Sequence, residues 1–298
     1  SWQSTYPVLQ ELENNIAPNL DRCGTNELAG IINALSGKFV TPGPSGAPTR
    51  GRPEVLPTGR NFYSVDTRAV PTQSAWQLGW KSAQRLVEHH AQCHGDWPTS
   101  IVLTAWGTSN MRTGGDDIAQ ALAFLGARPQ WDSISGRVIG FEILPLSLLD
   151  RPRVDVTLRI SGFFRDAFPA LIDLFDSAVR AIAALPEKKS DNPLADTVTK
   201  ETERLIAEGR GVNEANLEAG WRIFGSKPGA YGAGLQALID EGVWKKKEDL
   251  ANAYLTWGSW AYGSGTEGVF RQQSFEQRLR SVQAVVQNQD NREHDLLD

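Results

Sequence analysis

The sequence predicts an α/β fold, with a mainly parallel sheet layer and flanking helices, followed by a mostly helical region. Short apolar runs alternate with segments of helical period from residue 73 to residue 185. Strands separated by helices at this spacing are typical of parallel sheets. After the charged break at residues 186–192, nearly every segment has the helical period. These observations set the expected division of the chain into residues 1–55, 56–187 and 188–298.

The middle region, 56–187, is expected to be the α/β domain. Its helical segments are 73–90, 116–125 and 168–185, and its strand-like segments are 100–106, 137–144 and 153–160. Asp116 and Asp117 begin the second helix, where acidic residues suit the positive end of the helix dipole. Sites in such sheets lie beyond the carboxyl ends of the strands. The turns that follow Trp106 and Ile160 are therefore expected at the same edge of the sheet.

The two outer regions are expected to be mainly helical. Residues 27–35 have a helical period that ends at Gly37, and the Pro/Gly-rich stretch 36–60 is expected to be a long loop. Region 1–55 is thus interpreted as the end of a preceding helical region plus this loop. In 188–298 the expected helices are 193–208, 213–224, 230–241, 247–261 and 271–281, and a strand is expected at 282–287.

The composition excludes several functional classes. A net charge of −5 leaves no basic excess for nucleic-acid binding, and no apolar run of about 18 residues is present to cross a membrane. Two cysteines, Cys23 and Cys93, are too few for a disulfide framework or a four-thiolate zinc site, which fits a reducing, cytoplasmic compartment. The chain starts without Met and stops without a helix cap, so we expect an internal piece of a longer protein, truncated at its C-terminal end.

Three motifs are weak. Residues 263–268 have the G-x-G-x-x-G spelling, but the preceding segment is expected to be a helix rather than the strand that a dinucleotide site needs. Residues 225–227 nearly spell a phosphate loop with Ser and Lys in the wrong order, so no ATP site is visible. His90 and His94 share a helix face and could hold a metal, although an exposed helix end is the simpler interpretation.

Polar residues are concentrated at the expected edge of the sheet. The turn after Trp106 carries Asn110, Arg112, Thr113, Asp116 and Asp117, and the turn after Ile160 carries Ser161, Arg165 and Asp166 around Phe163 and Phe164, with Arg159 just before it. Guanidinium groups beside flat apolar faces suit a ligand with an apolar disc and acidic edges. Ordinary salt bridges are the alternative. Near the C-terminus, His294 lies among carboxylates in a polar stretch that could bind a first-row metal ion or form a solvated tail.

These motifs resemble the large-subunit family of aerobic cobaltochelatase, the CobN type. The resemblance extends from about residue 10 to the end and rests on Pro57–Asp66, Trp106–Asp117, Arg151–Val156, Ser161–Asp166 and Asn288–His294. The related magnesium chelatase large subunits typically have Lys-Asn-Ile-His-Ala-Leu-Asp after Pro-Thr-Gly. Here Arg60-Asn61-Phe62-Tyr63-Ser64-Val65-Asp66 follows instead, which favours cobalt. Family members are much longer than 298 residues.

The resemblance implies a ligase that forms nitrogen–metal bonds by inserting Co²⁺ into hydrogenobyrinic acid a,c-diamide during cobalamin synthesis. Co²⁺ would be the substrate metal, and ATP with Mg²⁺ would be used by separate AAA+ ATPase subunits rather than bound here. The piece alone is expected to be inactive. The alternatives are a magnesium chelatase large subunit acting on protoporphyrin IX and a non-catalytic tetrapyrrole-binding module. A carbohydrate-binding or hydrolytic protein is weakly supported, because adjacent acids at a helix start point to different faces.

The resemblance also suggests site residues. His294 and Glu293 are expected to deliver the metal or accept protons, with Asp66 and Asp116 as further catalytic candidates. The expected tetrapyrrole-binding residues are Arg60, Asn61, Trp106, Asn110, Arg112, Phe163 and Arg165. We expect these groups to converge around a flat macrocycle.

Overall fold

The computed structural model describes residues 2–46, 48, 52–63 and 65–290. It divides into two compact units: residues 1–66 with 111–114, and residues 67–110 with 115–298. The larger second unit contains the main sheet. None of its helices, nor any other helix in the described ranges, is long and apolar enough to cross a bilayer.

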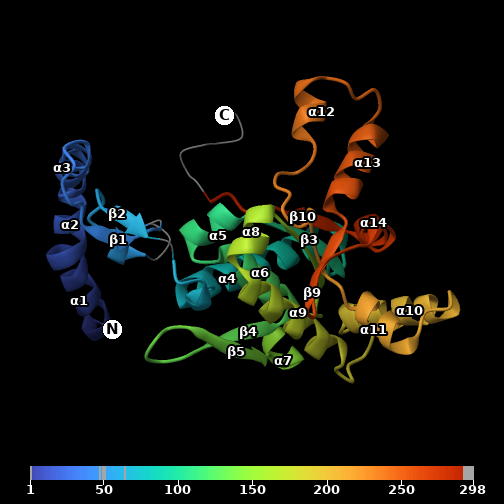
Figure 1. The fold of residues 1–298 in the computed structure, drawn as a ribbon. Helices are drawn as coiled ribbons and strands as arrows, with labels where there is room; N and C mark the ends of the chain where they lie inside the picture. The colour runs from blue at the N-terminus through green and yellow to red at the C-terminus, as the bar shows by residue number, and fades with distance from the viewer. Residues whose placement is uncertain (1, 47, 49–51, 64, 291–298) are drawn as a thin grey trace. The chain divides into compact units, whose positions relative to one another are not determined.

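The first unit is built from helices and a short parallel strand pair (Figure 1). Its elements are α1 (Trp2–Glu11), a π-helical turn (Leu12–Ile16), α2 (Ala17–Asp21), α3 (Cys23–Leu35), β1 (Pro42–Pro44) and β2 (Asn61–Tyr63). The Pro/Gly-rich stretch 36–60 is mostly loop, as expected, although it contributes β1. Gly59 has a φ of 83°, and a Cβ there would clash with the Asn26 backbone in α3. A glycine at this position therefore lets the loop lie against the helix.

The second unit is organised around a six-stranded sheet with the order β10-β3-β6-β7-β8-β9. The first four strands are parallel to one another. Strand β8 runs antiparallel to β7, and β9 runs antiparallel to β8. Their bounds are Ala284–Val286 (β10), Ser100–Ala105 (β3), Asp155–Ile160 (β6), Ile223–Gly225 (β7), Trp260–Gly263 (β8) and Thr266–Phe270 (β9). The predicted α/β class with a mainly parallel sheet and flanking helices is confirmed. The sheet takes strands from both the 56–187 and the 188–298 ranges.

Helix α6 (Asp116–Leu125) is the central helix of this unit. Every residue of α6 is buried, and the helix packs against α4 (Gln73–His94), α9 (Pro169–Ala183), β3 and β6. Two buried arginines satisfy carbonyls in its last turn. Arg151 donates to the carbonyls of Ala123 and Phe124, and Arg153 donates to that of Leu125. The Arg-Pro-Arg sequence at 151–153 thus has a structural role at the C-terminus of α6.

Helices α13 (Lys247–Gly258) and α14 (Gln272–Ser281) pack near β7. Phe224 of β7 stacks on Phe275 of α14, with ring centroids 4.9 Å apart. The buried Asp155 accepts from Arg222 Nε at 2.5 Å and lies 3.7 Å from Arg278 Nη1. Figure 1 shows α13 and the short α12 (Gln236–Asp240) extending away from the sheet, whereas α10 (Pro193–Ala207) and α11 (Val212–Ala219) pack side by side.

Several expected helix bounds are wrong. The helix in segment 213–224 ends at Ala219. Arg222, just before β7, contacts Asp155, and Phe224 of β7 contacts Phe275, which a continued helix would not allow. Of segment 230–241 only α12 is helical. Gly229, Gly232 and Gly234 hold positive φ values just before α12, which is incompatible with a continuous helix. Segment 247–261 stops at Gly258, and its last residues begin β8.

Two other segments have a different role from the one expected. The strand expected at 137–144 is β5 (Val138–Ile143), but it pairs with β4 (Ala127–Trp131) in a separate antiparallel hairpin. Residues 263–268 cover the end of β8, a two-residue turn and the start of β9. The turn residues Ser264 and Gly265 both have positive φ, as a tight hairpin turn requires. A strand therefore does precede the glycine motif, but another strand follows it and not a helix.

Candidate functional site

The turns after β3 and β6 lie together at the carboxyl edge of the sheet, as expected. The two strands are parallel neighbours, and the backbone N–H of Ser161 donates to the carbonyl of Ala105 at 3.0 Å. The Ser161 hydroxyl accepts from the N–H of Gly107 at 3.2 Å and also caps α8 (Gly162–Ala167) by accepting from Phe164. One serine side chain thus fixes both turns.

Two aromatic residues that are expected to bind the tetrapyrrole lie at this edge. Trp106 is 37% exposed and Phe163 is 40% exposed. A Cβ on Gly107 would come within 2.5 Å of the Phe163 ring, so the glycine lets that ring lie against the start of α5 (Gly107–Thr113). Partly exposed aromatic rings can provide a flat apolar surface for a large ligand.

A buried polar network, which we call the Asp117 network, lies beside this edge. Asn110 is fully buried, and its Nδ2 donates to the Trp106 carbonyl and to Asp117 Oδ2, both at 2.8 Å. Asn288, just beyond β10, donates from Nδ2 to Asp117 Oδ1 and to Gln120 Oε1, again both at 2.8 Å. The network therefore joins the turn after β3, the start of α6 and the end of β10.

Burial raises the pKa of Asp117 to about 6, and the hydrogen bonds from Asn288 and Asn110 limit that rise. Repulsion from Asp116 and Asp290 adds to it. A carboxyl group with a pKa near 6 is mostly ionised at pH 7, yet it binds a proton much more readily than an ordinary aspartate. Asp117 can therefore accept and release protons near neutral pH.

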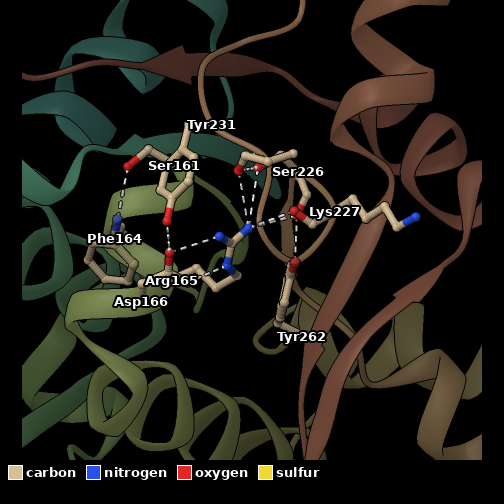
Figure 2. Close-up of polar contacts among 9 residues, drawn as sticks. Ser161, Phe164, Arg165, Asp166, Ser226, Lys227, Tyr231 and Tyr262 are labelled. Atoms are coloured by element: carbon tan, nitrogen blue, oxygen red, sulfur yellow. Dashed lines mark hydrogen bonds and ion pairs between the residues drawn. The ribbon is translucent and has the colours of Figure 1, made fainter.

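Arg165, expected to bind the ligand, donates to the protein itself in this structure (Figure 2). Its Nε and Nη2 form a bidentate pair with Asp166 at 2.6 and 2.9 Å, and its Nη1 donates to the carbonyl of Lys227 at 2.8 Å. Asp166 also accepts from the Tyr231 hydroxyl at 2.7 Å. Arg165 is 8% exposed. These contacts hold the loop at residues 226–231 against α8, and a contact of Arg165 with substrate stays a prediction.

The first unit contains four of the expected residues: Arg60, Asn61, Asp66 and Arg112. The half-buried Arg60 and the exposed Asn61 line a groove of about 650 Å³ together with Ile31 and Phe39. Asp66 and Arg112 are exposed. The second unit contains Trp106, Asn110, Phe163, Arg165 and the buried Asp116. Convergence of the two sets on one ligand stays a prediction.

The expected metal-delivery residues, Glu293 and His294, lie outside the described residues. Within the described ranges, no group of three or more His, Cys, Asp or Glu side chains could hold a metal ion. The other histidines lie on α4, as expected, with the rings of His90 and His94 4.4 Å apart and Cys93 Sγ 3.6 Å from His89 Nε2.

The roles of Asp117 and Asn288 are not apparent from the sequence. The Asp-Asp pair is recognisable at the helix start, but nothing in the sequence distinguishes the carboxylate that carries the network. Asn288 is the first residue of the polar stretch that follows the expected strand 282–287. Its position at the carboxyl end of a strand is the one signal that could have indicated its role.

Comparison with known proteins identifies the family. The family model described as CobN/Magnesium Chelatase matches residues 2–298. The chain belongs to this family. It is 63% identical to the aerobic cobaltochelatase subunit CobN of Sinorhizobium sp. over 100% of its own length and 23% of that protein. It is 36% identical to a magnesium-chelatase subunit of Cereibacter sphaeroides over 88% of its length and 21% of that protein.

A solved structure agrees with the fold of this family member. The catalytic subunit of cobaltochelatase from Mycobacterium tuberculosis matches 98% of the chain with a TM-score of 0.86 and 45% sequence identity, and the match covers 24% of that protein. The chain thus spans about a quarter of the length of these relatives. The resemblance expected from the motifs is confirmed.

Proposed function

We propose that the chain is part of the tetrapyrrole-binding subunit of an ATP-dependent cobaltochelatase that inserts Co²⁺ into hydrogenobyrinic acid a,c-diamide. The identity of 63% to a cobaltochelatase subunit, against 36% to a magnesium-chelatase subunit, supports cobalt as the metal. Hydrolysis of ATP with Mg²⁺ would take place on AAA+ partner subunits in the same cytoplasmic complex.

The observation that carries the proposal is the Asp117 network. Insertion of Co²⁺ into a corrin forms four nitrogen–metal contacts and releases the inner N–H proton of the ring, so the site needs a proton acceptor. Asp117, with its pKa raised to about 6 by burial, can take a proton and return it to water near neutral pH. It lies beside the exposed Trp106 through Asn110, which hydrogen-bonds to both residues.

The remaining residues are assigned roles by chemistry. Glu293 and His294 would bind Co²⁺ and replace part of its water shell, because carboxylate and imidazole suit a borderline divalent ion. Asn288 connects that end of the chain to the Asp117 network. Trp106 and Phe163 would cover the face of the macrocycle, while Arg60, Asn61 and Arg112 would bind its acidic periphery. Asp66 and Asp116 would be further proton acceptors.

The test replaces Asp117 by Asn in the intact subunit, assayed with its ATPase partners. We expect cobalt insertion to fall about 100-fold or more, while tetrapyrrole affinity, followed by tryptophan quenching, changes less than about threefold. The exposed Asp240→Asn is the matched control and should leave both unchanged. Full turnover in Asp117→Asn would refute the proton-acceptor role.

A second set of assays tests which metal is inserted and into which ring. Wild-type subunit should insert Co²⁺ into the corrin precursor and should not insert Mg²⁺ into protoporphyrin IX. The opposite preference would place the protein with the magnesium enzymes. Binding of the ring without insertion of either metal, in the presence of all partners, would support a non-catalytic binding module.

A further inference from the structure

A small cavity lies at the carboxyl ends of β3 and β6, next to the Asp117 network. Its volume is about 210 Å³, and its lining includes Trp106, Arg159, Tyr254 and Gln287. Pockets that enclose a whole drug-sized ligand measure roughly 300–1,000 Å³. This cavity is therefore too small for a macrocycle, and its size suits one side chain of a larger molecule.

Arg159 supplies the charge of this cavity. Its side chain is nearly inaccessible, with the residue 5% exposed, and its guanidinium lies over the Tyr254 ring at 5.5 Å from the centroid. Nη1 donates to the Ile160 carbonyl at 2.5 Å, but Nε is buried with no hydrogen-bond partner among the described residues. No carboxylate of the described residues forms an ion pair with Arg159. Burial lowers the pKa of Arg159, and the interaction with Tyr254 limits that fall.

The other buried arginines of the second unit have their partners within the protein. Arg153 pairs with Glu187 at 2.7 Å, Arg165 with Asp166, and Arg222 with Asp155. Arg151 lacks a carboxylate, but its three nitrogens donate to three carbonyls and to Gln84. Arg278 also has a carboxylate nearby, with its Nη1 3.7 Å from Asp155. Burial of a charge without a partner is strongly unfavourable. Among the buried arginines of the described residues, Arg159 is the one with neither a carboxylate nor several carbonyl acceptors.

We propose that this cavity is a subsite for one carboxylate side chain of the tetrapyrrole, with the Arg159 guanidinium as its ion-pair partner. The inference rests on the proposed function and names a contact that fixes how the ring is oriented. Trp106 lines the cavity and its carbonyl accepts from Asn110, while Gln287 precedes Asn288. A carboxylate held by Arg159 would therefore bring the attached ring toward Asp117. Gly258 leaves the room that the guanidinium needs, since a Cβ there would lie 3.1 Å from Nε.

The experiment compares Arg159→Met with wild type in the intact subunit. Two probes are used: the carboxylate form of the corrin precursor and its methyl ester, each titrated by tryptophan quenching. Wild type should bind the acid more tightly than the ester. In Arg159→Met, acid affinity should fall about 10- to 100-fold, while ester affinity changes less than about threefold. Arg128→Met, which removes an exposed arginine of the β4–β5 hairpin, should behave as wild type.

Thermal unfolding separates ligand binding from a structural role. Because Arg159 has no carboxylate partner in the described protein, Arg159→Met should keep or raise the melting temperature. A large drop in melting temperature, or equal loss of acid and ester affinity, would overturn the proposal. If wild type binds acid and ester equally, the subsite is refuted and the proposed function stands. If wild type binds neither tetrapyrrole, both are refuted.

Discussion

Arg165 and Arg159 have the same side chain, but they differ in whether its nitrogens have partners within the protein. Around Arg165 the described donors and acceptors satisfy one another: the guanidinium meets Asp166 and loop carbonyls, and Tyr262 donates to the Ser226 carbonyl (Figure 2). By contrast, Arg159 Nε and Asn110 Oδ1 are buried without hydrogen-bond partners in the described ranges. Buried polar groups are normally paired, so an unpaired guanidinium nitrogen on a residue that lines a cavity supports ligand binding there.

The same contrast separates structural from functional carboxylates. Asp155 is surrounded by Arg222 and Arg278, whereas Asp117 accepts from the neutral amides of Asn110 and Asn288 and has its pKa raised to about 6. A carboxylate paired with buried cations acts as a structural contact. A carboxylate that is buried among amides can change its protonation state near neutral pH.

The largest effect is expected from Asp155→Ala. It would leave two buried guanidinium groups without their carboxylate, which should cost about 3–5 kcal/mol of stability. Melting of the intact subunit and amide hydrogen exchange in β6 and α14 would measure this loss. Asp155→Asn, which keeps the shape but not the charge, should be nearly as damaging. A mild effect in both variants would show that these pairs do not stabilise the sheet.

Arg165→Met comes next. It removes a bidentate ion pair and the contacts to the loop at 226–231. The free energy of opening this loop should therefore fall by about 1.5–3 kcal/mol. Hydrogen exchange over residues 226–231 would report the opening. Arg165→Lys should rescue little, because one ammonium cannot reproduce the planar fork. Unchanged exchange together with lost tetrapyrrole binding would instead support the contact expected from the sequence.

A smaller, pH-dependent effect is expected from Asn288→Ala. The Asn288 hydrogen bond lowers the pKa of Asp117, so its removal should raise that pKa above about 6. Asp117 accepts protons only as the carboxylate, and a higher pKa leaves less carboxylate at any given pH. Cobalt insertion should therefore be impaired most near pH 6 and recover as the pH rises. The pH–rate profile would measure this shift.

The matched control for Asn288→Ala is Gln283→Ala. Gln283 lies at the other end of β10, where its Oε1 accepts from the Thr99 N–H at 2.6 Å. Its loss should weaken the attachment of the strand without moving the pH–rate profile. An identical shift in both variants would show that the position of β10, and not the hydrogen bond to Asp117, sets the pH dependence.

The sequence predicted the elements with long, clear patterns. Helix α6 and strand β3 were expected within a residue of their bounds, because ten residues of helical period and six consecutive residues of strand character are distinctive. Strand β7 was missed. It has only three residues, too few to distinguish a period of 2 from one of 3.6, and it is held in the sheet by Asp155, 67 residues earlier, through Arg222.

The candidate site was predictable to the edge of the sheet but not to the residue. Arg159 and Arg165 are six positions apart and have the same chemistry. Arg165 pairs with the adjacent Asp166, the ordinary salt bridge that the sequence left as an alternative, and with loop carbonyls such as that of Lys227, 62 residues away. Arg159 has no carboxylate partner in the described residues, and its Nε has no hydrogen-bond partner there. Likewise, Asp117 accepts a hydrogen bond from Asn288, 171 residues later, which follows the strand β10 that pairs with β3. Such long-range contacts leave no local signal in the sequence.

The smallest effect is expected from Arg128→Met. Arg128 and Glu142 face each other across the β4–β5 hairpin at 3.4 Å, with side chains 52% and 44% exposed. Water screens such a pair, so its loss should change stability by less than about 0.5 kcal/mol and leave tetrapyrrole binding unchanged. This tests whether burial is the property that matters. If Arg128→Met lowered the melting temperature as much as Arg165→Met, ion pairing anywhere would be stabilising, and the missing partner of Arg159 would lose its significance as a sign of ligand binding.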